Sequence, residues 1–264
     1  QDDELGQSYK GGIEKAIEGT DITLVADQPY NPLAETSPES KVVELAGSGA
    51  DVFFVGISGA PCPAALRAKP GTWTPLTYVN ITCTSKTAMA LAQGADEGIL
   101  SSQATLDPAN PEDQANPKVQ EFRTQAAAAG MSADDIDGGI TVAGWNFGAT
   151  FVRALELSET IDRATVMNTL WSLQGENYGM LRDEVKINTD GADDPWLIED
   201  IRIIKRSGGV AWRHSARTCL QRAAKRQPSA GSISLGTVPG MASSRVLCIA
   251  SRSMRGIERI SPCV

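Results

Sequence analysis

Residues 37–57 read SPESKVVELAGSGADVFFVGI, and this stretch predicts the fold. Ser37 is a favourable helix cap, Pro38 suits the first helical position, and apolar residues recur at helical spacing as far as Gly47. The run DVFFVGI at residues 51–57 carries no charged or polar side chain after Asp51, which is typical of a strand that is buried on both faces. A helix followed by a buried strand is the repeating unit of a parallel sheet covered by helices.

The same alternation continues on both sides of this stretch. The pattern predicts further helices over residues 8–18, 63–68 and 85–92 and further strands over residues 22–26, 75–81 and 98–102. Short links between such elements favour the α/β class, with a parallel sheet and helices on both faces. In sheets of this kind, ligands bind beyond the carboxyl ends of the strands.

After residue 103 the pattern becomes mainly helical. The polar, proline-rich stretch DPANPEDQAN at residues 107–116 predicts a loop, and Asn116 is placed to cap the helix that follows. Helices are predicted over residues 117–129, 139–157 and 163–173, with Asp162 capping the last, and strand-like segments over residues 185–187 and 197–204. On the long middle helix, Trp145 and Phe147 are expected to pack into the core.

The charge of the chain reverses near residue 205. Residues 1–205 carry 31 Asp and Glu against 14 Lys and Arg, a net charge of −17. Residues 206–264 carry one acid, Glu258, against 10 Lys and Arg, a net charge of +9. The acidic part is not expected to bind nucleic acid, because a phosphate-binding surface needs clustered Lys and Arg.

The basic tail also loses the hydrophobic pattern, and three explanations of it stay open. It could be an arm that binds nucleic acid or a membrane surface. It could be a disordered extension. It could also be translated from the wrong reading frame, which its scattered Ser, Arg and Cys without periodicity favour. On either of the last two explanations, its removal would leave the rest of the chain as stable as before.

The residue types argue against an enzyme. Residues 1–205 contain no histidine, the commonest general base and metal ligand. Consecutive acids such as Asp134 and Asp135 are typical of solvated loops. The glycine-rich stretches at 47–49 and 56–59 lack the context of a dinucleotide fold and lack a P-loop lysine. We therefore predict no catalytic residues, no cofactor and no metal site.

Targeting signals are not expected within the chain. No apolar run reaches the roughly 20 residues of a membrane span. The chain also lacks a basic segment followed by an apolar one, so no signal peptide is expected in it, and Gln1 begins in the middle of a pattern. The sequence therefore resembles part of a longer protein.

Polar residues follow two strands that should be neighbours. Ser58 and Gly59 follow the strand over 51–57, and Asn80 and Thr82 lie at the end of the strand over 75–81. Because the carboxyl ends of parallel strands meet at one edge of a sheet, these residues are predicted to face the same cleft. Free amides at Ser58 and Gly59 could receive a carboxylate, although a purely structural turn is the alternative.

Two cysteines also follow these strand ends. Cys62 and Cys83 could approach closely enough for a disulfide. Two unrelated, small buried residues are the alternative, and the sequence favours it because two cysteines in the first 205 residues do not form a disulfide framework.

A set of motifs then follows in a characteristic order and spacing. They are QDDELGQSYKGG, VADQPYNP, GSGADVFFVGISGAP, GTWTPL, EGIL, DPANPEDQANPKVQEF, GWNFGATFVRALE and VKINTDGADDPWLIEDIRIIK. Each motif alone is weak. Together, over about residues 1–212, they resemble the type I periplasmic solute-binding proteins of the branched-chain amino-acid-binding family, which serve ABC transporters.

The resemblance implies two α/β lobes that are joined by a hinge and close on a small solute. It implies that the chain corresponds to the C-terminal part of such a protein and so to an incomplete two-lobe structure. Residues 1–98 would form lobe two, residues 99–180 the helices that return to lobe one, residues 181–212 the return to lobe two, and residues 213–264 the basic tail. The first strands of lobe one, which carry part of the ligand site in the family, would lie outside the chain.

The resemblance also bears on the site. Leu5 matches a position beside the hinge that is often aromatic in the family, and it could offer apolar contact to a ligand. Some members place an acid near residues 80–84 to hold the ammonium group of the ligand. This sequence has only NITCT there, which argues against an α-amino-acid ligand.

The function that the resemblance implies is non-enzymatic. The protein is expected to be the substrate-binding component of an ABC importer in the periplasm. It would bind a small polar solute, such as an amino acid, an amide or a small carboxylate, and present it to a membrane permease. The alternative is a ligand-sensing regulatory domain of the same fold.

Overall fold

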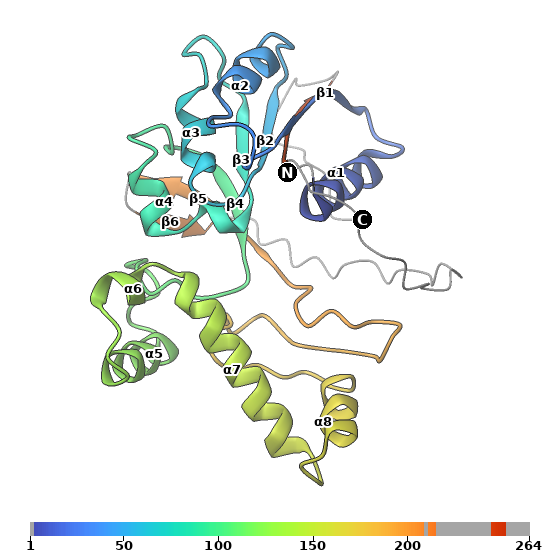
Figure 1. Ribbon diagram of the computed structural model, residues 1–264, viewed down its shortest axis with the longest axis vertical. Helices are drawn as coiled ribbons and strands as arrows, with labels where there is room; N and C mark the ends of the chain where they lie inside the picture. Colours follow the sequence, from blue (N-terminus) through green and yellow to red (C-terminus); the bar gives the residue numbers. More distant parts are fainter. Residues whose placement is uncertain (1–2, 209–210, 215–243, 252–264) are drawn as a thin grey trace. The chain divides into compact units, whose positions relative to one another are not determined.

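The computed structural model describes residues 3–208, 211–214 and 244–251, which form two compact units (Figure 1). The first unit comprises residues 3–101, 204–208, 211–212 and 244–251, and the second comprises residues 102–203 and 213–214. The chain thus leaves the first unit within one strand and re-enters it within another. Across the described residues, no helix is both long and apolar enough to cross a membrane.

The first unit is built on a sheet of seven strands. In chain order these are β1 (Ile22–Tyr30), β2 (Val52–Gly56), β3 (Leu76–Val79), β4 (Leu100–Gln103), β5 (Arg202–Ser207), β6 (Ala211–His214) and β7 (Ser244–Ser251). Their order across the sheet is β1-β7-β2-β3-β4-β5-β6. Strand β3 pairs in parallel with both β2 and β4, which confirms the predicted parallel core of the sheet.

Four helices and a short 3₁₀ helix accompany these strands. They are α1 (Glu4–Ile17), α2 (Glu39–Ala46), α3 (Pro61–Arg67), the 3₁₀ helix η1 (Ile81–Cys83) and α4 (Lys86–Ala90). Apolar side chains of the strands, such as Phe53 and Val79, are fully buried, and they share one core with Leu45 of α2 and Leu66 of α3. Helices α2 and α3 therefore pack against the sheet, as the alternation in the sequence predicted.

The start of α2 differs by one residue from the prediction. Pro38 occupies the cap position and the helix begins at Glu39, so Pro38 is not the first helical residue. The hydroxyl of Ser37 still accepts a hydrogen bond from the Glu39 amide at 3.3 Å. Ser37 therefore caps the turn that leads into the helix.

The basic tail departs from the sequence prediction at residues 244–251. This segment forms β7, which lies between β1 and β2 and pairs antiparallel with both. Its sequence, SRVLCIAS, contains a short apolar run that the composition of the whole tail obscures. Without β7, the facing edges of β1 and β2 would leave backbone N–H and C=O groups unpaired. The sheet is consequently mixed, and residues 215–243 and 252–264 lie outside the described residues.

The second unit is mainly helical. Its helices are α5 (Pro117–Ala128), α6 (Ala133–Asp137), α7 (Ile140–Leu157) and α8 (Arg163–Leu170). Asn116 caps α5 by accepting from the Lys118 amide at 3.0 Å, and Asp162 caps α8, both as predicted. Helix α6 was not predicted, because consecutive acids such as Asp134 and Asp135 are typical of loops. Acids are, however, also favourable in the first turn of a helix.

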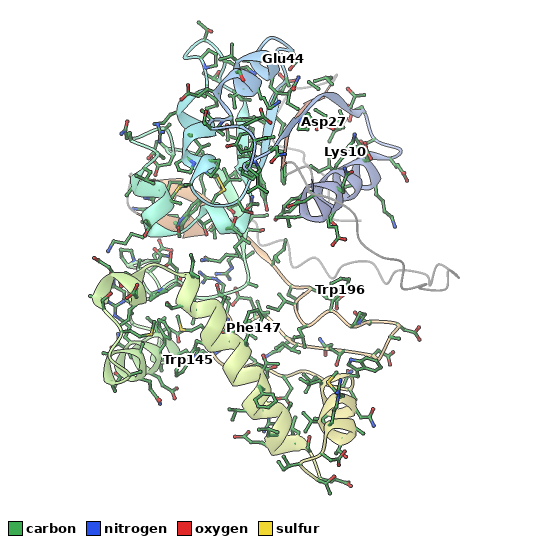
Figure 2. The ribbon with its side chains drawn as sticks, in the orientation of Figure 1. Lys10, Asp27, Glu44, Trp145, Phe147 and Trp196 are labelled. Atoms are coloured by element: carbon green, nitrogen blue, oxygen red, sulfur yellow. A yellow bond between two sulfur atoms is a disulfide. The ribbon has the colours of Figure 1, made fainter. Side chains whose placement is uncertain are left out.

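The two aromatic residues expected in the core behave differently. The ring of Trp145 meets the buried ring of Phe122 edge to face, with centroids 5.5 Å apart. Phe147 is 72% exposed, so the prediction that it packs into the core is wrong. Residues two apart on a helix point to nearly opposite sides, so Trp145 and Phe147 cannot share one buried face (Figure 2).

Candidate functional site

Four of the five residues predicted to bind a solute, Ser58, Gly59, Asn80 and Thr82, lie on two loops at the carboxyl ends of β2 and β3. Strand β2 ends at Gly56, and residues 57–60 lead into α3. Strand β3 ends at Val79, and Asn80 caps the 3₁₀ helix η1. The two strands are direct parallel neighbours, with Val55 opposite Val79. The structure therefore brings these two loops to the same edge of the sheet, as predicted.

Asn80 ties the two loops together. Its Nδ2 donates to the carbonyl oxygen of Ile57 at 2.7 Å and to that of Val55 at 3.4 Å. Its Oδ1 accepts from the backbone amide of Thr82 at 2.8 Å and from the Thr82 hydroxyl. An asparagine side chain has two N–H donors and two acceptor lone pairs, so these four bonds use its full capacity. Asn80 is 2% exposed.

A disulfide joins the same loops. Cys62, in the first turn of α3, is bonded to Cys83, the last residue of η1, with their Cα atoms 6.0 Å apart. Both cysteines are fully buried. The alternative that the sequence favoured, two unrelated cysteines, is therefore wrong. The sequence could not decide this, because pairing depends on how closely β2 and β3 approach each other.

Ser58 and Gly59 form the turn between β2 and α3. The hydroxyl oxygen of Ser58 is buried and has no hydrogen-bond partner among the described residues. Gly59 has a φ of +70°, a conformation that side chains disfavour, and its carbonyl oxygen accepts from the Cys62 amide at 3.1 Å. The amides of Ser58 and Gly59 have no acceptor within the described part of the chain. This turn therefore contains a buried hydroxyl and two amides that have no partner among the described residues.

Thr82 and Leu5 occupy different surroundings. Thr82 is exposed, and its hydroxyl donates to Asn80, which leaves the oxygen able to accept from a ligand. Leu5 is 39% exposed on the first turn of α1. No described hydrogen bond ties Leu5 to the two loops. The structure thus gathers Ser58, Gly59, Asn80 and Thr82 and leaves Leu5 as a separate prediction.

The two loops carry no ionisable side chain. Residues 57–62 and 79–84 contain no Asp, Glu, Lys, Arg or His. Within the described residues, no group of three or more His, Cys, Asp or Glu is arranged to hold a metal ion. This edge of the sheet can hydrogen-bond a polar ligand, but it supplies neither a counter-charge nor an acid or base.

Aromatic contacts on the same strands were not found from the sequence. The ring of Phe54 on β2 stacks with that of Tyr78 on β3, with centroids 5.4 Å apart, and Tyr9 of α1 lies 5.3 Å from Phe54. Burial raises the pKa of the Tyr9 hydroxyl, and the nearby Tyr78 adds to the shift. Phe54 and Tyr78 are opposed in register, and no signal of that register was present in the sequence, because the run VFFVG of β2 does not alternate.

An ion pair attaches α1 to β1. The ammonium group of Lys10 lies 3.0 Å from a carboxylate oxygen of Asp27 (Figure 2). Lys10 belongs to the motif QDDELGQSYKGG and Asp27 to the motif VADQPYNP. Both motifs therefore contribute to the packing of the same unit, and neither contributes a polar group to the two loops.

Comparisons with known proteins agree with this architecture. The family model described as periplasmic binding protein matches residues 1–201. A solved branched-chain amino acid ABC transporter protein from Thermus thermophilus with bound valine is 17% identical, with a TM-score of 0.51 over 68% of this chain and 50% of that one. A leucine binding protein from Thermotoga maritima is 12% identical, with a TM-score of 0.50 over 69% of this chain and 49% of that one.

A protein from Rhodopseudomonas palustris is 15% identical, with a TM-score of 0.50 over 69% of this chain and 52% of that one. The chain thus spans about half the length of the structures it matches. At these identities the likeness shows the fold. No curated protein matches the sequence.

Proposed function

The chain belongs to the periplasmic binding protein family, and from this membership we propose that it is part of the solute-binding component of an ABC importer. The family consists of binding proteins and not of enzymes. The mostly parallel sheet flanked by helices is the type I form of the fold. In this proposal the first unit is lobe two, and the second contains the helices that return to lobe one.

The edge formed by the ends of β2 and β3 supports a solute site. It contains the buried hydroxyl of Ser58 and the amides of Ser58 and Gly59, which have no partner among the described residues, and the exposed hydroxyl of Thr82. Such groups suit a small polar solute with carboxylate or amide oxygens. We propose an amino acid, an amide or a small carboxylate as the solute, and Leu5 as an apolar contact.

The absence of charged side chains on these two loops restricts the kinds of solute that they can bind. Residues 57–62 and 79–84 offer no carboxylate to an ammonium group. An amino-acid solute would therefore have its ammonium group held elsewhere in the protein. Solutes without an ammonium group fit these loops better.

The mechanism in this proposal is closure of two lobes on the solute. A solute that contacts both lobes stabilises the closed form, because it interacts more strongly with that form than with the open one. The membrane permease would then recognise the closed form in the periplasm. Relatives described as ABC transporter proteins support this partner.

A ligand-sensing regulatory domain of the same fold is the second candidate. Its ligand site would be the same, so the two functions differ in what the closed form contacts. A permease encoded beside the gene would favour transport. A kinase or DNA-binding domain in the same full-length protein would favour sensing.

Two substitutions in the full-length protein test the site. Ser58→Ala and Thr82→Val each remove one hydroxyl and keep the approximate shape. Loss of one hydrogen bond from a closed, dry site should weaken solute binding about tenfold to a hundredfold. Isothermal titration against L-valine, L-leucine, acetamide and propionate would measure this.

Thr124→Val is the matched control, because Thr124 is exposed on α5 in the second unit. It should leave the affinity unchanged. If the Thr82→Val protein binds as tightly as the parent, Thr82 lies outside the site, and Ser58 and Gly59 remain the candidates. If neither variant changes the affinity, the edge formed by β2 and β3 is not the solute site.

A further inference from the structure

We infer that Asn80 and the Cys62–Cys83 disulfide act together as a strand-end clamp that positions Ser58 and Gly59 for the solute. The clamp is defined by these three side chains, which join the loop after β2 to the loop after β3. The inference rests on the proposed function and deepens it. It makes Asn80 a positioning residue, where the sequence had suggested a direct contact with the solute.

The clamp converges on one backbone group. The carbonyl oxygen of Ile57, the residue before Ser58, accepts from Asn80 Nδ2 at 2.7 Å. The Sγ atom of Cys83 lies 3.1 Å from the same oxygen. A disulfide sulfur carries no hydrogen, so this second approach is a packing contact. Ile57 O is thus held from the side of β3 by both parts of the clamp.

The turn has few other hydrogen bonds. Residues 57–60 have one further hydrogen bond among the described residues, from the Cys62 amide to Gly59 O at 3.1 Å. Cys62 is itself a member of the disulfide. The position of the Ser58 hydroxyl therefore depends on the clamp at both ends of the turn, through Ile57 before it and Cys62 after it.

The chemistry at position 80 requires an amide. Asn80 donates hydrogen bonds to two carbonyl oxygens, that of Val55 on β2 and that of Ile57 just after β2. An ionised carboxylate has no proton to donate to them. An aspartate there would place a negative oxygen against Ile57 O, with no proton between them.

The same four bonds exclude Asn80 from contact with the solute. Both of its N–H groups and both acceptor sites are occupied within the protein, and only 2% of its surface is exposed. A change at Asn80 can reach a solute only by displacing its neighbours. The effect of such a change should then depend on whether the displaced neighbour contributes to binding.

The first test needs no solute and uses the present chain. Asn80→Asp, and separately Cys62→Ser with Cys83→Ser, should speed hydrogen exchange at the backbone amide of residue 62, which closes the turn, about tenfold or more. Exchange within β2 should stay unchanged. Asn168→Asp makes the same change of charge at an exposed position on α8 and should leave the turn unaffected.

Peptide mapping without reductant should recover Cys62 and Cys83 in one linked pair. If the double serine variant does not fold, reduction of the parent chain replaces it. Unchanged exchange at Cys62 in Asn80→Asp overturns the clamp. So does recovery of the two cysteines as free thiols.

The second test separates positioning from a general loss of stability. In the full-length protein, affinity for L-valine, L-leucine, acetamide or propionate is measured for Ser58→Ala, Asn80→Asp and the double variant. If Asn80 acts through the turn that it positions, the loss of affinity in the double variant should be smaller than the product of the two single losses. Independent effects that multiply overturn the inference.

The two proposals can fail separately. Absence of binding for any solute contradicts the solute site, while the exchange experiment still decides the clamp. Unchanged exchange contradicts the clamp, while a loss of affinity in Ser58→Ala still supports the solute site.

Discussion

The carboxyl group of Asp107 is placed where its charge is unfavourable. Its Oδ1 accepts from the Ala109 amide at 2.8 Å. Burial raises the pKa of Asp107 above the ordinary aspartate value of 3.8; Asp113 and Asp137 also raise it, whereas the Ala109 amide and Arg182 lower it. The neighbouring Asp113 is compensated, because Arg182 binds both of its oxygens, at 2.8 and 3.2 Å. Asp107 therefore holds its loop through one hydrogen bond and opposes folding through its charge.

Replacing Asp107 by Asn should stabilise the protein at pH 7. The amide oxygen can still accept from Ala109, and the unfavourable charge is gone. A carboxyl whose pKa is raised in the folded state contributes more stability as the pH falls through that pKa toward 3.8. The stability of the parent protein should therefore approach that of the variant as the pH is lowered.

Thermal melts of both proteins at pH 7 and pH 4.5 would measure this difference. Asp193→Asn, at an exposed position, is the control and should change Tm little at either pH. If the difference in Tm between Asp107→Asn and the parent is the same at both pH values, the pKa of Asp107 is not raised in the folded state.

The predicted roles of single residues are confirmed where the residue acts on its near neighbours in the chain. Asn116 and Asp162 cap their helices as predicted, because a cap bonds to amides two or three residues away. Asn80 was identified as important, but its partners Val55 and Ile57 lie more than twenty residues earlier. Its engagement with β2 could not be read from the residues around it.

Among the secondary-structure elements, β7 connects two strands that would not otherwise be paired with each other. It pairs over residues 244–251 with β1 and over residues 245–249 with β2. Both neighbours are antiparallel to it, so β1 and β2 run in the same direction with one strand between them. Without β7, the facing edges of β1 and β2 would both be open. One extended segment between them pairs the backbone groups of both edges.

Ending the chain after residue 243 should lower Tm by about 5 °C or more. The truncation removes β7 and exposes backbone groups on two strands, and each kcal/mol corresponds to roughly 2–4 °C in a domain of this size. This expectation replaces the one from the sequence, in which loss of the tail leaves stability unchanged.

Ending the chain after residue 251 is the control, because it keeps β7. It should leave Tm within about 2 °C of the parent. Equal melting temperatures for the two truncated proteins would show that β7 contributes nothing to the stability of the sheet. Circular dichroism melts at one protein concentration suffice for the comparison.

Considered as a whole, the chain leaves a large apolar surface exposed on α7. Four side chains are more than half exposed: Ile140, Phe147, Phe151 and Val152. Phe147 and Phe151 are four residues apart and so lie on the same side of the helix. The proposed assignment of α7 to the helices that return to lobe one is consistent with such an open face, because the strands that these helices would cover are not part of the sequence described.

Replacing Phe147 and Phe151 together by Ser should reduce self-association. Exposed apolar patches of this kind drive association, and neither side chain belongs to a buried core cluster. Light scattering coupled to gel filtration should show a shift toward the monomer, and binding of the dye bis-ANS should fall.

The melting temperature should stay within about 2 °C, since no buried contact is lost. Phe122→Ser is the contrasting variant, because Phe122 is 1% exposed, and it should lower stability by about 3–5 kcal/mol. Unchanged dye binding after the double substitution at Phe147 and Phe151 would show that α7 is not the exposed apolar surface.

The alternation of helices and strands, the helix caps and the family were all readable from the amino-acid sequence. These features depend on spacing and on neighbours a few residues apart, and the family rests on the order of such local motifs. The tertiary structure alone decided four features. These are the disulfide, the hydrogen bonds of Asn80 to β2 and Ile57, the place of β7 between β1 and β2, and the exposure of Phe147. Each of these depends on which distant segments pack together, and local spacing carries no information about that packing.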